Sequence, residues 1–249
     1  MTFVNEKTGE QHSLVKSIFL HVITGILITL FLLFITPFLL AIGLTPEFGM
    51  LFGFIFIGEP IQLGYMLYLG RKKNNKFSLK GVILNQAPLL KGNYFLPILL
   101  VIAVIFIIST ITEPINVLLS NTTFSWLPYW LLNSDPLFYT NSILIIQVIF
   151  VFQLIVDGVI NPIIEELYWR GFLLPRLSRY GIYSVIINGF LIAIQHFWQI
   201  FNFALLIPVS LILSYIVYRY KSVYLSMITH CLINTIGILI FYIAIFLNF

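Results

Sequence analysis

Residues 18–44 read IFLHVITGILITLFLLFITPFLLAIGL, an apolar run without Asp, Glu, Lys or Arg. A helix of about 20 such residues crosses the hydrocarbon core of a bilayer. The run is too long for the core of a signal peptide and lacks a small-x-small cleavage site. We therefore expect a retained transmembrane helix over Ile18–Leu44, with a kink at Pro37.

The whole chain shares this apolar character. Of its 249 residues, 60% are hydrophobic and only 9% are charged, and the mean hydropathy is +1.03. Soluble domains carry about 45–50% apolar and about 25% charged residues, and disordered chains combine low hydrophobicity with high charge. The composition therefore excludes both classes and predicts an all-α, polytopic membrane protein. The one cysteine, Cys231, excludes an internal disulfide.

Seven apolar runs are long enough to be candidate transmembrane helices. We expect them to form a bundle of about seven helices, one membrane domain over residues 1–249, with a polar cavity inside it. The stretch Trp126–Leu132 is expected to be an interfacial loop. The seven runs are Ile18–Leu44, Phe48–Leu69, Tyr94–Thr112, Ile143–Leu174, Ile182–Phe201, Phe203–Tyr218 and Val223–Leu247.

Apart from Arg170, which lies inside the fourth run, the basic residues lie before the first run or in alternate loops between the seven runs. The positive-inside rule then places the N-terminus in the cytoplasm and the C-terminus outside. The net charge of +4 therefore reflects membrane topology, and we expect the lipid bilayer as a partner and no nucleic acid. The residues are Lys7 and Lys16; Arg71, Lys72, Lys73, Lys76, Lys80 and Lys91; Arg176 and Arg179; Arg219 and Lys221.

Ionisable groups inside a bilayer are costly, so they are candidates for a functional site. Counted from the basic loops at 1.5 Å per residue, polar residues of three helices fall at overlapping depths. Glu166 and Arg170 are four residues apart and are expected to pair, which leaves Glu165 free. The candidates are Asp157, Asn161, Glu165, Glu166 and Arg170; Asn188, Gln195 and His196; Ser226, His230 and Asn234. Of these we expect Asp157, Asn161 and Asn188 to be structural; His21 and Glu59 are further intramembrane polar residues with no role fixed by the sequence.

Three motifs in order resemble those of the CAAX-protease and bacteriocin-processing family of intramembrane proteases. Glu165-Glu166-Leu-Tyr-Trp-Arg170-Gly171 is similar to its Glu-Glu-x-x-x-Arg motif, His196 to its second motif, and His230-Cys-Leu-Ile-Asn234 to its third. The resemblance covers about Asp157 to Ile238. One position departs from the pattern, because the family has Phe four residues before the second-motif His and this chain has Ile192.

The resemblance implies a peptidase with its catalytic core at about residues 143–247, acting on a membrane-associated peptide or protein. Glu165, helped by His196, is expected to activate water, and His230 and Asn234 are expected to stabilise the oxyanion. Glu166 and Arg170 are the expected supporting pair. The family's glutamate-dependent mechanism implies no cofactor; a zinc ion, if present, would take Glu165, His196 and His230 as ligands.

Two other classes of function remain open from the sequence. A non-enzymatic bacteriocin immunity protein or membrane scaffold would keep the same fold without peptidase activity. A transporter or proton relay would also use intramembrane carboxylates, but such proteins often consist of two related halves, and no internal repeat is visible here.

Overall fold

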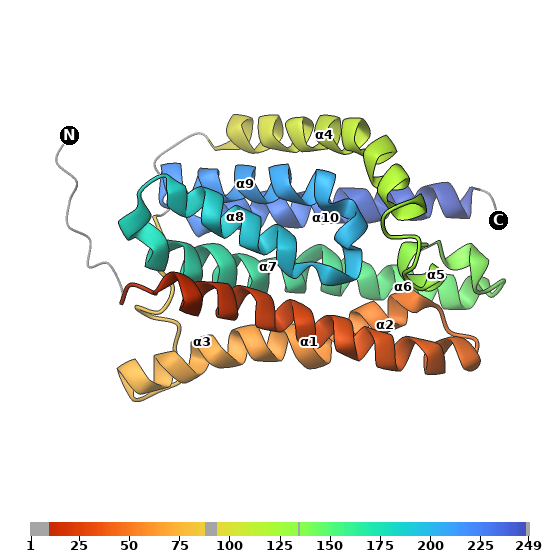
Figure 1. Cartoon of the computed structure of the whole chain (residues 1–249), viewed down its shortest axis with the longest axis horizontal. Coiled ribbons are helices and arrows are strands. Elements are labelled where there is room, and N and C mark those ends of the chain that lie inside the picture. Colours follow the sequence, from red (N-terminus) through yellow and green to blue (C-terminus); the bar gives the residue numbers. More distant parts are fainter. Residues whose placement is uncertain (1–9, 88–93, 134, 248–249) are drawn as a thin grey trace.

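The computed structural model describes residues 10–87, 94–133 and 135–247. Two of the basic residues named above, Lys7 and Lys91, lie outside the described residues. Within these three ranges the chain forms helices and two isolated β-bridges, with no strand. The helices run side by side along the long axis of the molecule (Figure 1).

Six helical segments are long and apolar enough to cross a membrane, which confirms the all-α membrane fold. They are α1 (Leu14–Ala41); α2 (Pro46–Gly53) continuing through Phe54–Gly58 into α3 (Glu59–Asn74); α4 (Phe95–Asn121); α6 (Ile143–Ile155) continuing through α7 (Asn161–Glu166) to Tyr180; the segment Phe197–Tyr220 with α9 (Phe203–Tyr220); and α10 (Val223–Phe246). The short α5 (Tyr129–Leu132) occupies the expected interfacial loop.

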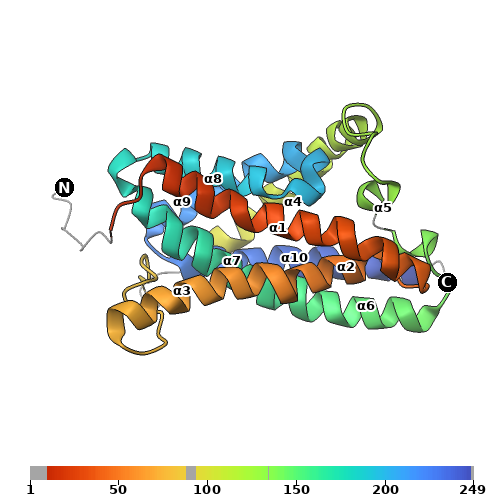
Figure 2. The same ribbon diagram turned by 60° about the horizontal axis from the view of Figure 1, so that its bottom comes forward.

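The expected fifth helix is shorter than the apolar run Ile182–Phe201 predicts. The structure has α8 (Tyr183–Gln195), whose 13 residues are about 20 Å long. The chain leaves the α-helical path at His196 (φ −78°, ψ 54°) and turns through a 3₁₀ segment, Phe197–Asn202, into α9. Both views show this turn short of the end reached by α1 (Figures 1 and 2).

Tertiary packing fixes this early turn. The Trp198 side chain is 2% exposed and its ring contacts Phe54 edge-on, with centroids 5.8 Å apart. Since Phe, Trp and Ile fit a continued helix as well as a buried turn, the apolar pattern alone did not mark the end of α8. Among the described residues, the bundle therefore consists of six long helical segments and the shorter α8.

The basic loops gather at one end of the bundle, the end where the N-terminal part of α1 lies (Figure 1). Backbone and side-chain hydrogen bonds join them: His12 N donates to Arg176 O (3.0 Å), and Ala87 N donates to Lys221 O (2.9 Å). Arg176 Nη1 also donates to Val82 O (3.1 Å). The alternation of basic loops along the chain thus matches their arrangement in space.

The long helix from Ile143 to Tyr180 is not a regular α-helix. As a continuous α-helix its 34 residues from Ile143 to Arg176 would be about 51 Å long, more than the hydrocarbon core of about 30 Å, and this length predicts a tilt, a protrusion or a break near Pro162. The helix instead widens into π-helical turns at Val156–Ile160 and Leu167–Leu173 and tightens into a 3₁₀ helix at Leu174–Tyr180. Pro162 lacks an N–H group and crowds the preceding turn, and the first π turn ends two residues before it, at Ile160. Such π turns occur often at functional sites.

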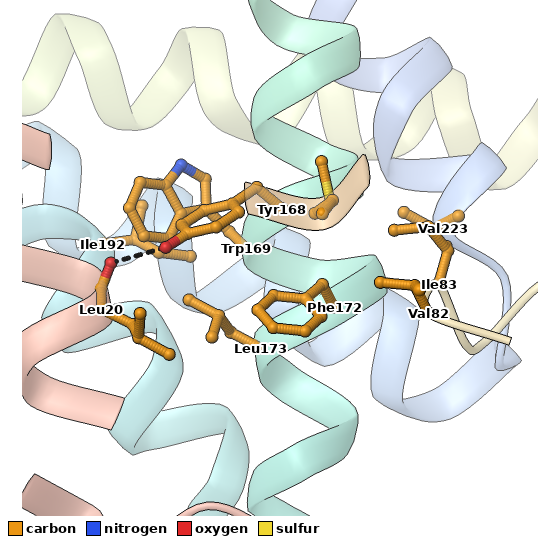
Figure 3. Close-up of a cluster of buried hydrophobic side chains, with 10 residues drawn as sticks. Leu20, Val82, Ile83, Tyr168, Trp169, Phe172, Leu173, Ile192 and Val223 are labelled. Carbon is orange, nitrogen blue, oxygen red and sulfur yellow. Dashed lines mark hydrogen bonds between the residues drawn. The ribbon is translucent and has the colours of Figure 1, made fainter. Parts of the chain in front are cut away.

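A buried cluster of side chains holds the second π segment in place (Figure 3). Tyr168, Trp169 and Phe172 project from this segment and are at most 1% exposed. The Tyr168 hydroxyl donates to Leu20 O of α1 at 2.9 Å. The cluster also contains Leu20, Met66, Val82, Ile83, Leu173, Ile192 and Val223. Because Glu165 and Glu166 directly precede these aromatic residues, the cluster fixes the helix that carries both carboxylates.

Close packing between α1 and α8 positions the residue that precedes His196. A Cβ atom on Gly25 of α1 would lie 1.8 Å from the backbone oxygen of Gln195. Only glycine permits this approach, as at other interfaces between membrane helices. The end of α8, and with it His196, is therefore set against the middle of α1.

Candidate active site

The four residues expected to be catalytic line one cavity of about 480 Å³. They are Glu165, His196, His230 and Asn234, from α7, the end of α8 and α10. Asp157 and Asn161 also line it, and the remaining wall is mainly apolar, with Met50, Phe54, Ile105, Phe106, Leu206 and Val209. A water molecule occupies about 30 Å³, so the cavity has room for part of a peptide.

The two adjacent glutamates have different surroundings. Glu166 is fully buried, and its Oε1 accepts from Arg170 Nη1 and from His230 Nδ1, the latter at 2.9 Å. Glu165 is 6% exposed and contributes to the cavity wall, which Glu166 does not. The expected Glu166–Arg170 ion pair is thus present, and Glu165 is the carboxylate that borders the open space.

Arg170 is held by α9 as well as by Glu166. Its Nε donates to Ser214 Oγ and its Nη2 to the Ser210 carbonyl, each at 3.3 Å. Ser214 Oγ in turn donates to Asn188 Oδ1 at 2.9 Å. Asn188 Nδ2 lies 3.0 Å from Trp169 O and 3.1 Å from His21 Nε2. This buried network fixes Arg170 behind the cavity, and it gives His21 and Asn188 structural roles away from the open space.

The contact with Glu166 defines the hydrogen-bonding state of His230. Since a carboxylate oxygen only accepts hydrogen bonds, Nδ1 of His230 carries the hydrogen in this contact. In the neutral ring Nε2 is then a hydrogen-bond acceptor, whereas in the imidazolium Nε2 also donates. Helical spacing does not predict this contact, because it joins residues 64 positions apart.

His196 is oriented by the backbone of its own helix. Its Nδ1 lies 2.6 Å from the Ile192 carbonyl, so Nδ1 donates and Nε2 is the basic nitrogen of the neutral ring. The ring also packs against Trp198, with centroids 4.9 Å apart. The departure from helical geometry at His196 places this ring on the cavity wall rather than within a continued helix.

Asn234 supports the π turn opposite to it. In that turn Asn161 N donates to Val156 O, five residues back. The next residue, Pro162, has no N–H to offer to the Asp157 carbonyl, and Asn234 Nδ2 donates to that carbonyl at 2.9 Å. One amide hydrogen of Asn234 therefore has a structural partner, and the other has no acceptor among the described residues and is available to a ligand in the cavity.

Asp157 and Asn161, which we interpreted as structural, border the same cavity as Glu165. The signal was their spacing, since residues 157, 161 and 165 follow one another at intervals of four along one helix face. The Asp157 Oδ1 atom is buried and has no hydrogen-bond partner within the described residues. The cavity thus contains two carboxylates, and no Lys or Arg of the described part of the chain lines it.

Within the described ranges, no three His, Cys, Asp or Glu side chains are grouped closely enough to hold a metal ion. This includes the set Glu165, His196 and His230, which we named as the ligands of a zinc ion. In this arrangement the three side chains share a cavity wall without forming a ligand cluster.

The fold and this cavity define a multi-pass helical membrane protein with ionisable side chains enclosed among its spans. Residues 147–236 match the family model of type II CAAX prenyl endopeptidase Rce1-like proteins. This match confirms the resemblance to the CAAX-protease and bacteriocin-processing family, and it contains all four candidate catalytic residues. The family implies a protease. No curated protein and no solved structure gives a significant match to the chain.

Proposed function

We propose that the protein is an intramembrane endopeptidase that uses Glu165 to hydrolyse a peptide bond in a membrane-associated substrate. The observation that carries this proposal is the division between the two glutamates. Glu166 is occupied by Arg170 and His230, whereas Glu165 borders a 480 Å³ cavity that also contains His196, His230 and Asn234.

In the first step a water molecule beside Glu165 attacks the carbonyl carbon of the substrate. The carboxylate of Glu165 takes a proton from the water as the new C–O bond forms, and Nε2 of His196 accepts a hydrogen bond from the same water. General-base catalysis of this kind contributes about 10²–10⁴-fold to a rate. Both side chains line the cavity, as this step requires.

In the second step the tetrahedral intermediate is stabilised and collapses. The oxyanion accepts hydrogen bonds from the second amide hydrogen of Asn234 and from Nε2–H of His230 in its imidazolium form. The Glu166 carboxylate, 2.9 Å from Nδ1, stabilises that cation. The C–N bond then breaks, and Glu165 returns its proton to the leaving amine, so protons and electron pairs balance.

The substrate class follows from the position of the cavity. The cavity lies among membrane-spanning helices, and apart from its polar residues its wall is mainly apolar. This environment favours a peptide or protein tail associated with the bilayer. We place the protein in the cell membrane with its N-terminus and the basic loops in the cytoplasm, following the positive-inside rule. We propose no cofactor.

The test is a comparison of peptides and C-terminal protein ends in membranes from cells with wild-type protein and with Glu165→Gln. Glutamine keeps the shape of the side chain and removes the base. Glu113→Gln is the matched control, because Glu113 is an exposed carboxylate of α4 outside the cavity. We expect specific cleavage products to vanish only in Glu165→Gln.

Identical peptide profiles at equal protein levels would contradict the proposal and leave immunity or scaffolding by binding as the better account. Metal dependence is tested separately with purified protein and a chelator. We expect activity to survive chelation. Loss of activity that zinc restores would instead assign Glu165, His196 and His230 as metal ligands.

A further inference from the structure

A second polar cavity, of about 300 Å³, lies at the end of the bundle where the basic loops meet. Its wall combines the start of α1, the end of α3 and the 3₁₀ end of the long helix. Four of its lining side chains are cationic, namely Lys16, Lys72, Lys73 and Arg176, and one is acidic, Glu10. None of its lining residues belongs to the 480 Å³ cavity, so it is a separate site.

Arg176 is a buried cation that forms no ion pair with the described residues. Its side chain is 7% exposed, and within the described residues no carboxylate lies within 4.0 Å of it. Nη1 makes both of its hydrogen bonds, to Phe172 O (2.6 Å) and Val82 O (3.1 Å). Neutral carbonyls do not neutralise the guanidinium, and buried charges are normally paired. Among the described residues Nε and Nη2 have no hydrogen-bond acceptor, so they are available as donors to an anion in the cavity.

The aromatic ring of Phe172 packs against the face of the Arg176 guanidinium. The Arg176 Cζ atom lies 4.0 Å from the centroid of the Phe172 ring, and Phe172 is itself fixed in the core cluster shown in Figure 3. A cation stacked on an aromatic face keeps its edge donors free. The guanidinium is thus held in a set orientation instead of moving freely at the surface.

His12 lies in the wall of the same cavity, and one of its ring nitrogens has no hydrogen-bond partner among the described residues. It is 3% exposed, and its Nδ1 is buried without a hydrogen-bond partner among the described residues. The ring contacts Phe172 edge-on, with centroids 5.8 Å apart, and the backbone N–H donates to Arg176 O. Burial, with the charges of Lys16 and Arg176, lowers the pKa of His12 to about 4, so at neutral pH its ring offers one N–H. An acceptor in the cavity would satisfy it.

The lysines complete a wall with excess positive charge. Lys73 Nζ donates to Gly81 O at 2.8 Å. Lys16 approaches Glu10 at 4.0 Å, but the Glu10 side chain is 87% exposed and the pair is correspondingly weak. Three lysines and a buried arginine around one cavity match the charge and the acceptor oxygens of a phosphate group.

We propose that this cavity binds a phosphate group, the headgroup phosphate of an anionic lipid or a free phosphate anion, between Arg176, His12 and the surrounding lysines. The site lies at the end of the spans, at the level where lipid headgroups meet a membrane helix, and basic pockets there attract anionic lipids. Arg176 is eleven residues after Glu165 on the same long helix. A ligand at Arg176 would therefore hold the helix that carries Glu165 at a fixed depth.

The experiment measures binding to the full chain, purified in an uncharged detergent, by titration calorimetry at fixed ionic strength. The probes are short-chain phosphatidylglycerol, short-chain phosphatidylcholine and inorganic phosphate. The variants are Lys16→Gln and Lys72→Gln, which change partly exposed residues and leave the buried contacts of Arg176 in place. Lys76→Gln is the matched control, because Lys76 is an exposed lysine near α3 that does not line the cavity.

We expect phosphatidylglycerol to bind more tightly than phosphatidylcholine, and each of the two variants to weaken it about fivefold, from about 1 kcal/mol per basic residue. Lys76→Gln should bind like wild type. Binding of phosphatidylglycerol without binding of inorganic phosphate identifies a lipid site, and the reverse identifies a site for a free anion. Equal binding in wild type, Lys16→Gln and Lys72→Gln, or no binding of either anion, would overturn the proposal.

Discussion

Replacing Arg170 by methionine should lower the free energy of unfolding by about 3–5 kcal/mol, because breaking a buried ion pair leaves an unpaired buried charge. Glu166 is fully buried and Arg170 is 2% exposed. Without Arg170, the Glu166 carboxylate keeps only the hydrogen bond from His230, and its Oε2 already has no partner within the described residues. Methionine fills much of the space, so the lost charge dominates the effect.

The double variant Glu166→Gln/Arg170→Met separates charge from packing. The glutamine is neutral, and its Oε1 can still accept from His230 Nδ1. Since neutral replacements of buried ion pairs are often tolerated, the double variant should be at least about 2 kcal/mol more stable than Arg170→Met alone. Both are compared by equilibrium unfolding in mixed micelles.

Arg179→Met is the control for this series. Arg179 is exposed and its Nη2 donates to Tyr180 Oη at 2.7 Å, so its replacement should change stability by no more than about 0.5 kcal/mol. The reasoning is refuted if Arg170→Met costs under about 1 kcal/mol, or if the double variant is less stable than Arg170→Met.

Three further predictions concern other contacts. Gly25→Ala should destabilise by at least about 1–3 kcal/mol in the same unfolding assay, because its Cβ would collide with Gln195 O; Gly64→Ala, with nothing within 4 Å of its Cβ, should not, and equal effects would contradict the packing described. Asn234→Ala should reduce peptide cleavage by about 10²-fold or more if its amide serves the oxyanion, and unchanged turnover would remove it from the site. Stability should fall as pH is lowered from about 6.5 to about 4, because the folded chain holds His12 neutral while the unfolded chain binds a proton; His12→Gln should flatten this slope, and an unchanged slope would exclude His12 as its source.

The membrane-helical fold was predictable because it depends on local composition. A segment of about 20 apolar residues satisfies its backbone hydrogen bonds only as a helix in a bilayer, so each run could be identified from its own residues. The gathering of the basic loops at one end followed from the alternation of charged and uncharged connections. The Glu166–Arg170 pair followed from spacing, since residues four apart meet on one helix face.

The candidate site was predictable only as a set of residues. Three helices carried polar groups at matching depths, and six of these residues border one cavity: Asp157, Asn161, Glu165, His196, His230 and Asn234. Which neighbours each group meets was decided by contacts between distant parts of the chain. His230 meets Glu166 across 64 residues, and Asn234 meets the Asp157 carbonyl across 77.

The chain's own residues thus determined the class of protein, the helical runs and the motif residues, because hydropathy and helical spacing are local properties. Tertiary structure alone decided that His230 also contacts Glu166, that α8 ends at Gln195, and that Asp157 and Asn161 join the cavity wall. These features depend on the π turns around Pro162 and on the packing of Trp198 and Gly25 against other helices. The rotation of a helix about its axis is fixed by what packs against it, and a single sequence does not specify that partner.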